Sequence, residues 1–109
     1  MNTEKLLTVV QNALEEKKAK DIKILDVHQF SSITDFMVVA TGRTARQAIA
    51  LAQYVIEKAK SYGHRPLGDE GRDVGEWVLV DLGDVIVHVM QPQTRDFYQL
   101  EKLWSEMTA

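Results

Sequence analysis

Three stretches of the chain carry apolar residues at the three- and four-residue spacing of an amphipathic helix. This spacing predicts helices over residues 3–18, from just after Gly42 to about Ser61, and over Arg95–Ser105. Gly63 is placed to stop the second helix, because glycine readily adopts the left-handed conformation that ends many helices. The apolar stripe of that helix consists of small and branched side chains, which allow close packing on a sheet: Ala45, Ala48, Ile49, Ala52, Val55, Ile56 and Ala59.

Strands are predicted where β-branched residues are concentrated. Asp21–Val27 alternates enough to be a strand, and Phe36–Thr41 is apolar almost throughout. Trp77–Val80 and Val85–Met90 are two further apolar runs, joined by a short turn in which Gly83 can adopt a positive φ. These two runs predict a β-hairpin, and their apolar character places it at the centre of the sheet.

The predicted elements follow the order α-β-β-α-β-β-α, with a short strand or loop in the turn-rich stretch Arg65–Asp73 before the hairpin. Helices that alternate with pairs of strands imply an α/β or α+β fold, with a mixed sheet covered on one or both faces. A chain of 109 residues is long enough for one core, so we expect a single domain over residues 1–109.

Composition excludes several classes of protein. The chain has no cysteine, which rules out disulfides, thiol catalysis and cysteine-based zinc sites. Its apolar runs are shorter than the roughly 20 residues of a membrane-spanning helix, and its first residues lack the pattern of a signal peptide. A cytoplasmic protein without a membrane partner is therefore expected.

Negative charge is concentrated around the hairpin. The net charge of −3 argues against broad contact with DNA or RNA. Residues 69–84 contain six acidic side chains and a single basic one, Arg72. Such a belt can steer a basic partner towards the hairpin, or it can simply keep a loop solvated. Asp81 and Asp84 flank the hairpin turn, and with Trp77 they predict one corner that combines carboxylates with an aromatic ring.

Tyr98 is predicted to point outward from the last helix. At about 100° per residue, Tyr98 lies nearly opposite the centre of the apolar cluster of that helix. The cluster consists of Phe97, Leu100, Leu103 and Trp104. Exposure of one tyrosine means little by itself, but tyrosine and tryptophan are the usual anchors of protein interfaces.

The spacing of polar residues predicts no catalytic or metal site. His28, His64 and His88 are too far apart in sequence to form a known metal motif. His88 falls on a buried strand, where a core histidine with satisfied hydrogen bonds is expected. Asp81 and Asp84 could hold a cation or share a proton, but capping of the turn is favoured. No metal, cofactor or active site is therefore expected.

Several blocks of sequence resemble the ribosomal silencing factor family, also called Iojap-like. The blocks are Ser31–Met37 (SSITDFM), Thr41-Gly42, Pro66–Gly68 with Glu70-Gly71, Trp77–Met90 (WVLVDLGDVIVHVM) and Leu100–Trp104 (LEKLW). They occur in order over nearly the whole chain, and the first, fourth and last together are highly specific.

The resemblance implies a non-enzymatic repressor of translation. Members of the family bind the large ribosomal subunit through a basic protein, the fourteenth in the large-subunit series, at the face where the small subunit docks. Binding there blocks subunit joining and lowers translation in stationary phase or starvation. The implied fold is similar to that of nucleotidyltransferases without their catalytic residues, and no cofactor or DNA partner is implied. Contact with ribosomal RNA would be minor, and a weak homodimer is compatible with the resemblance.

The resemblance also implies which residues face the ribosome. They are Trp77, Asp81 and Tyr98, with Asp69, Glu70, Leu82, Asp84 and Met90 as neighbours. The two aromatic rings would supply anchor area, and the carboxylates would meet lysine or arginine of the partner. For three of these residues a purely structural role remains open: Trp77 as half core, Met90 as core, and Asp84 as a turn cap.

Two other functions remain open from the sequence. One is an enzyme that binds or transfers nucleotides, using residues 41–44 at a helix start with Asp26 or Asp35, although the chain lacks a glycine-rich phosphate motif. This alternative rests on analogy of fold. The other is a homo-oligomeric adaptor that pairs through an open sheet edge near Pro66.

Overall fold

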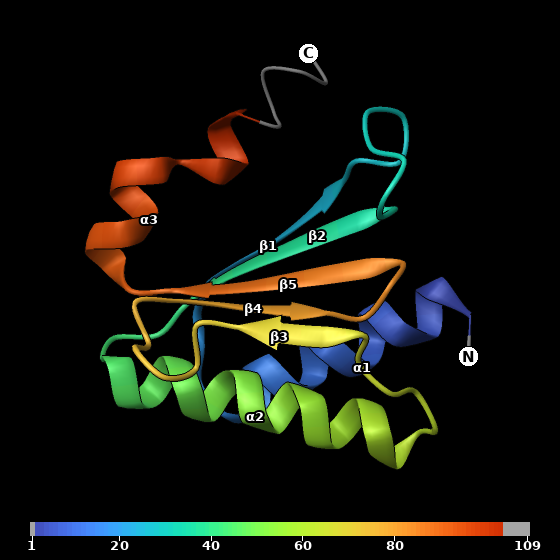
Figure 1. Cartoon of the computed structure of the whole chain (residues 1–109), viewed down its shortest axis with the longest axis horizontal. Coiled ribbons are helices and arrows are strands. Elements are labelled where there is room, and N and C mark those ends of the chain that lie inside the picture. The colour runs from blue at the N-terminus through green and yellow to red at the C-terminus, as the bar shows by residue number, and fades with distance from the viewer. Residues whose placement is uncertain (1, 104–109) are drawn as a thin grey trace.

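The computed structural model describes residues 2–103, which form a five-stranded sheet and three helices (Figure 1). The elements are α1 (Thr3–Glu16), β1 (Lys20–Asp26), β2 (Phe36–Thr41), α2 (Ala45–Ser61), β3 (Gly68–Glu70), β4 (Trp77–Asp81), β5 (Val85–Met90) and α3 (Pro92–Tyr98). The predicted order is confirmed, and the turn-rich stretch before the hairpin contains a short strand. The first helix ends two residues earlier than predicted, and Lys18 follows it with a positive φ of 62°.

The sheet has the strand order β1-β2-β5-β4-β3. β2 and β5 run parallel, and the other neighbouring strands run antiparallel, so the predicted mixed sheet is confirmed. β4 and β5 form the predicted hairpin, with Gly83 at a φ of 88° in its turn. β5 is the central strand, which accounts for the apolar residues on both of its faces.

α1 and α2 pack together on one face of the sheet, below it in Figure 1. Alternate residues of the strands point into this layer, as the two-residue period of a strand requires. They are Val38 and Ala40 of β2, Val78 and Val80 of β4, and Val85, Val87 and Val89 of β5. The predicted small-residue stripe of α2 is buried against them at Ala48, Ala52, Val55, Ile56 and Ala59, together with Leu51.

α3 lies on the other side of the sheet and differs from its prediction. It begins at Pro92, three residues before the predicted start at Arg95, and the missing N–H and fixed φ of proline suit the first turn of a helix. It ends at Tyr98, because Gln99 adopts the left-handed conformation with a φ of 48°. A further helical turn follows at residues 100–103. The predicted positions Trp104 and Ser105 lie outside the described residues.

The break at Gln99 destroys the apolar face predicted for this helix. Phe97 is 80% exposed and Leu103 is 52% exposed, so neither lies on a buried stripe.

None of the helices within residues 2–103 is long and apolar enough to cross a membrane.

Candidate binding face

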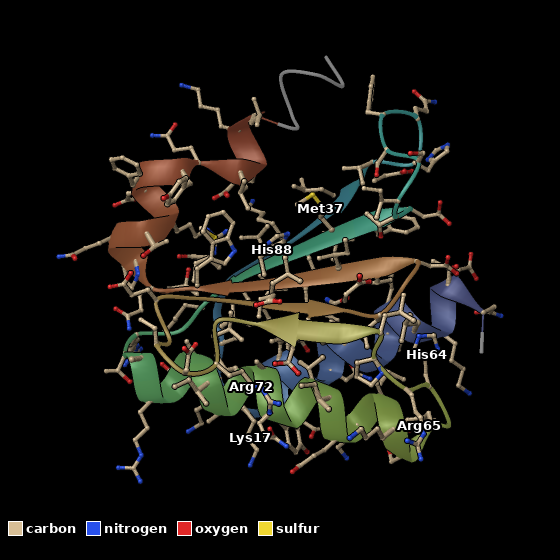
Figure 2. All side chains as sticks on the ribbon, viewed as in Figure 1. Lys17, Met37, His64, Arg65, Arg72 and His88 are labelled. Carbon is tan, nitrogen blue, oxygen red and sulfur yellow. The ribbon has the colours of Figure 1, made fainter. Side chains whose placement is uncertain are left out.

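The face of the sheet opposite α1 and α2, here called the open face, is covered by α3 at one end. Figure 2 shows Met37 and His88 pointing to this side, whereas Arg72 lies beside α2. Residues that alternate with the core positions make up the open face. On the three strands of the hairpin side they are Trp77, Leu79 and Asp81 of β4, Ile86, His88 and Met90 of β5, and Glu70 of β3, which pairs with Leu79. Met37 of β2 and the exposed Lys23 of β1 continue the same face. Leu79 and Ile86 are half-buried, so apolar area is accessible here.

Trp77 and Tyr98 meet at the end of the open face beneath α3. Their ring centroids are 4.8 Å apart, at an angle of 51°. Phe97 adds an edge-on contact, with its centroid 5.0 Å from that of Tyr98. Tyr98 is 53% exposed and Trp77 is half-buried, so the predicted outward direction of Tyr98 is confirmed while one side of its ring rests on Trp77. The resulting aromatic cluster of Trp77, Phe97 and Tyr98 has the composition of an interface anchor.

His88 lies beside Trp77 within the sheet. The Trp77 indole Nε1–H donates a hydrogen bond of 2.9 Å to Nδ1 of His88. His88 is 5% exposed, and burial lowers its pKa to about 4, so the imidazole is neutral near pH 7. Because Nδ1 accepts, the proton lies on Nε2, which is buried without a partner among the described residues. The predicted burial of His88 is therefore confirmed. The expectation that both of its ring nitrogens have hydrogen-bond partners is wrong.

Arg95 attaches α3 to the sheet. Its side chain is buried, and Nη1 donates a hydrogen bond of 2.7 Å to the Thr41 hydroxyl on β2. Its Nε donates to Oε1 of Glu101 at 2.9 Å, across the break at Gln99. Burial alone would raise the pKa of Glu101. Its hydrogen bond from Arg95, a hydrogen bond from its own backbone and the positive charge of Arg95 outweigh this effect and lower the pKa below its usual value. Arg95 therefore fixes the helix that carries Tyr98.

Replacing Arg95 with methionine is expected to release α3 while the sheet stays folded. Oε1 of Glu101 and the Thr41 hydroxyl lose their partner, but Glu101 is partly exposed and can be rehydrated. We expect the free energy of unfolding to fall by about 1–2 kcal/mol. NMR contacts between the rings of Trp77 and Tyr98 should disappear.

Arg72→Met is the matched control, because Arg72 pairs with Asp69 in a more exposed position. It should cost less than about 1 kcal/mol and keep the contacts between the two rings. Retention of those contacts in Arg95→Met would contradict the role assigned to Arg95.

Asp81 and Asp84 lie at the far end of the hairpin from Trp77, so the prediction of one shared corner is wrong. Trp77 and Asp81 are the two ends of β4, about 13 Å apart at the usual rise of a strand. Asp81 accepts a hydrogen bond of 2.9 Å from the Gly83 N–H, which confirms the predicted turn cap. Asp84 accepts instead from the Thr3 hydroxyl at 3.0 Å and ties the start of α1 to the hairpin. Across residues 2–103, no three acidic or histidine side chains converge on a metal position.

Three further residues predicted for the site do not share the open surface. Asp69 pairs with Val80 and so points to the helix-covered face, where Arg72 donates two hydrogen bonds of 2.9 and 3.1 Å to its carboxylate. Leu82 is 1% exposed within the core. Met90 is fully buried beside Trp77 in the register of the sheet. These three are corrected to structural roles, whereas Glu70 is exposed on the open face.

Leu79 and Ile86 belong to the accessible apolar area and were missed from the sequence. Both strands of the hairpin carry apolar residues on both faces, and this was explained by a central position in the sheet. The number of helices could have indicated an open face, because α1 and α2 are both needed to cover the opposite face and only one helix is left.

At the start of α2, side chains of this segment already accept from two of the backbone N–H groups that an anion could use. The Arg43 N–H donates to Oε1 of Gln47 at 2.7 Å, and the Gln47 N–H donates to the Thr44 hydroxyl at 3.1 Å. The helix is therefore capped by its own side chains. Asp26, on the last position of β1, is hydrogen-bonded to His28, which lowers the pKa of Asp26.

Comparison with known proteins identifies the family. The family described as ribosomal silencing factor during starvation matches residues 1–109. A ribosomal silencing factor of Chromobacterium violaceum is 47% identical over 104 residues, covering 95% of this chain and 85% of that protein. The mouse protein named mitochondrial assembly of ribosomal large subunit protein 1 is 31% identical over 102 residues, covering 91% of this chain and 45% of the mouse protein.

The fold agrees with this match. The crystal structure of a C. violaceum protein has a TM-score of 0.94 and 47% identity, covering 96% of this chain and 88% of that chain. The full-length match and the shared fold together show that the chain belongs to the ribosomal silencing factor family, which regulates translation and is not enzymatic.

Proposed function

We propose that this protein represses translation by binding the large ribosomal subunit with its open face and blocking the approach of the small subunit. The partner is a basic protein of the subunit interface, the fourteenth in the large-subunit series. The observation that carries the proposal is the partly exposed pair of Trp77 and Tyr98, which lies where α3 covers one end of the open face, in a chain of the silencing factor family.

The chemistry of the open face suits a basic protein partner. Trp77 and Tyr98 offer aromatic area with few rotatable bonds, and tryptophan and tyrosine are enriched among residues that dominate binding energy. Leu79 and Ile86 continue this apolar area along the sheet. Glu70 and Asp81 add carboxylates on the same face, where lysine or arginine of the partner can pair with them.

The carboxylates of the open face make nucleic acids unfavourable partners. Glu70 and Asp81, on the part of the face that β3 and β4 form, are acidic, so ribosomal RNA contributes little to a contact there and DNA contributes none. The proposal takes the protein to be cytoplasmic, and it requires no cofactor. Sedimentation over a concentration series tests for a weak homodimer.

Trp77→Ala combined with Tyr98→Ala is expected to weaken binding to isolated large subunits by at least about thirtyfold, or roughly 2 kcal/mol. The reason is the loss of both anchor rings from a face that keeps its carboxylates. Cosedimentation with large subunits measures the affinity. In a gradient assay of subunit joining, the wild type should reduce the fraction of joined ribosomes, and the double variant should not.

Tyr62→Ala is the matched control for the tyrosine. Tyr62 is 55% exposed, close to the 53% of Tyr98, but it lies at the end of α2 on the other side of the sheet. Its removal should leave binding unchanged. Wild-type affinity of the double variant would reject the assigned site, and normal subunit joining at saturating wild-type protein would reject the steric mechanism.

A further inference from the structure

We propose that His88 is a positioning residue for ribosome binding, which holds the Trp77 indole in the orientation that stacks on Tyr98. This inference rests on the proposed function and names a residue that does not itself reach the partner. His88 is 5% exposed, so any effect on binding must pass through a neighbour, and the neighbour that it bonds is Trp77.

The register of the hairpin sets up this contact. His88 pairs with Leu79 and Met90 pairs with Trp77, so Trp77 and His88 are diagonal neighbours on the open face. Side chains at diagonal positions are within reach when they are long or aromatic. The ring centroids are 5.8 Å apart, and the 2.9 Å hydrogen bond uses the indole N–H, the one polar hydrogen of the tryptophan side chain. One side of Trp77 is therefore fixed by His88, while its ring also contacts Tyr98.

Stability alone does not explain a histidine at this position. The residues before and after it are Val87 and Val89, and Val39 is its partner on β2. Nε2 of His88 carries a buried proton with no acceptor among the described residues, and a buried unpaired donor is unfavourable. An apolar side chain would avoid that cost. The feature that an apolar side chain cannot supply is the acceptor at Nδ1, and this acceptor serves Trp77.

Nδ1 of His88 is available as an acceptor at neutral pH. Burial keeps the pKa of His88 at about 4, so Nδ1 stays unprotonated at neutral pH. Rotation of Trp77 away from Tyr98 would break the bond and leave both ring nitrogens of His88 without a partner. The orientation of the indole is thus fixed before any partner arrives, which lowers the entropy lost on binding.

Two substitutions at position 88 separate the acceptor from the rest of the side chain. His88→Asn keeps an acceptor close to the position of Nδ1, and His88→Leu fills similar space without one. We expect His88→Leu to weaken binding to isolated large subunits about tenfold, and His88→Asn to stay within about threefold of the wild type. In the indole region of a ¹H–¹⁵N spectrum, the Trp77 signal, assigned by its loss in Trp77→Phe, should move in His88→Leu and stay close to its original position in His88→Asn.

A double-mutant cycle with Trp77→Phe tests whether the effect passes through the indole N–H. Phenylalanine keeps an aromatic ring but cannot donate to His88. In this background, His88→Leu should change the affinity by less than about twofold. An equal loss in both backgrounds would overturn the proposal, as would wild-type affinity of His88→Leu in the original background. Thermal unfolding checks that each variant is folded, and His88→Val replaces His88→Leu if leucine is not accommodated between its valine neighbours.

Failure of this inference is distinguishable from failure of the proposed function. If the Trp77→Ala, Tyr98→Ala variant loses binding and His88→Leu does not, the binding face stands and the role of His88 is rejected. If the double alanine variant binds normally, both are rejected.

Discussion

Replacing Gly71 with alanine should lower the free energy of unfolding by about 4 kcal/mol or prevent folding. Gly71 has a φ of +89°, a conformation that L side chains rarely adopt. An added Cβ would also lie 2.1 Å from the Trp77 carbonyl oxygen and 3.2 Å from its carbonyl carbon. Both neighbours are backbone atoms of a strand, so they cannot move aside as the end of a flexible side chain would. Denaturation by urea measures the loss.

Gly63→Ala separates the two causes. Gly63 has nearly the same φ, +82°, but nothing lies within 4 Å of the added Cβ, because this glycine is exposed to solvent after the end of α2. Only the backbone cost applies, and we expect about 1–2 kcal/mol. The difference between the two variants is the cost of the clash with Trp77. Equal losses would show that the backbone next to Trp77 is free to shift.

The Gly71 variant also links stability to the binding face. If it folds, the added methyl group must displace the backbone that carries the Trp77 side chain. We therefore expect it to bind large subunits more weakly than Gly63→Ala does, when both are compared at a temperature where each is folded.

The hairpin illustrates what the sequence made predictable. Two apolar runs around a glycine-containing turn fixed the register locally, since a two-residue period and a tight turn leave few alternatives. The small-residue stripe of α2 similarly defined which face of the helix packs on the sheet. Both signals involve residues close in sequence, and both were confirmed.

The candidate site depended on information that local patterns do not hold. The predicted strand Trp77–Val80, with Asp81 in the turn after it, already separated Trp77 from Asp81 by the length of the strand, so the idea of one shared corner was an error of interpretation. By contrast, the sequence pattern gave no sign that Asp69 would point to the helix-covered face, because β3 has three residues and little periodicity. The course of α3 depends on Arg95, which pairs with Thr41 at a distance of 54 positions in sequence. Long-range contacts of this kind determine the position of Tyr98.

Lowering the pH from 7 to 4 should remove about 3 kcal/mol of stability through His88 alone. In the unfolded chain His88 titrates near its ordinary pKa of 6.5, whereas in the folded protein burial lowers that pKa to about 4. Between these two values the unfolded state binds a proton that the folded state does not bind. The contribution of His88 is therefore fully present above about pH 6.5, falls as the pH decreases towards 4, and becomes constant below that value.

His88→Asn provides the reference, because asparagine does not titrate in this range. The free energy of unfolding, measured by urea denaturation at several pH values, should fall more steeply for the wild type than for His88→Asn. Other groups, such as the exposed pair of Asp26 and His28, whose pKa values are lowered and raised by their hydrogen bond, are present in both proteins and cancel in the difference. Parallel curves would show that His88 accepts a proton in the folded state as readily as in the unfolded one. In that case Nδ1 could not remain a constant acceptor for Trp77, and the orientation of the indole would change over the same pH range.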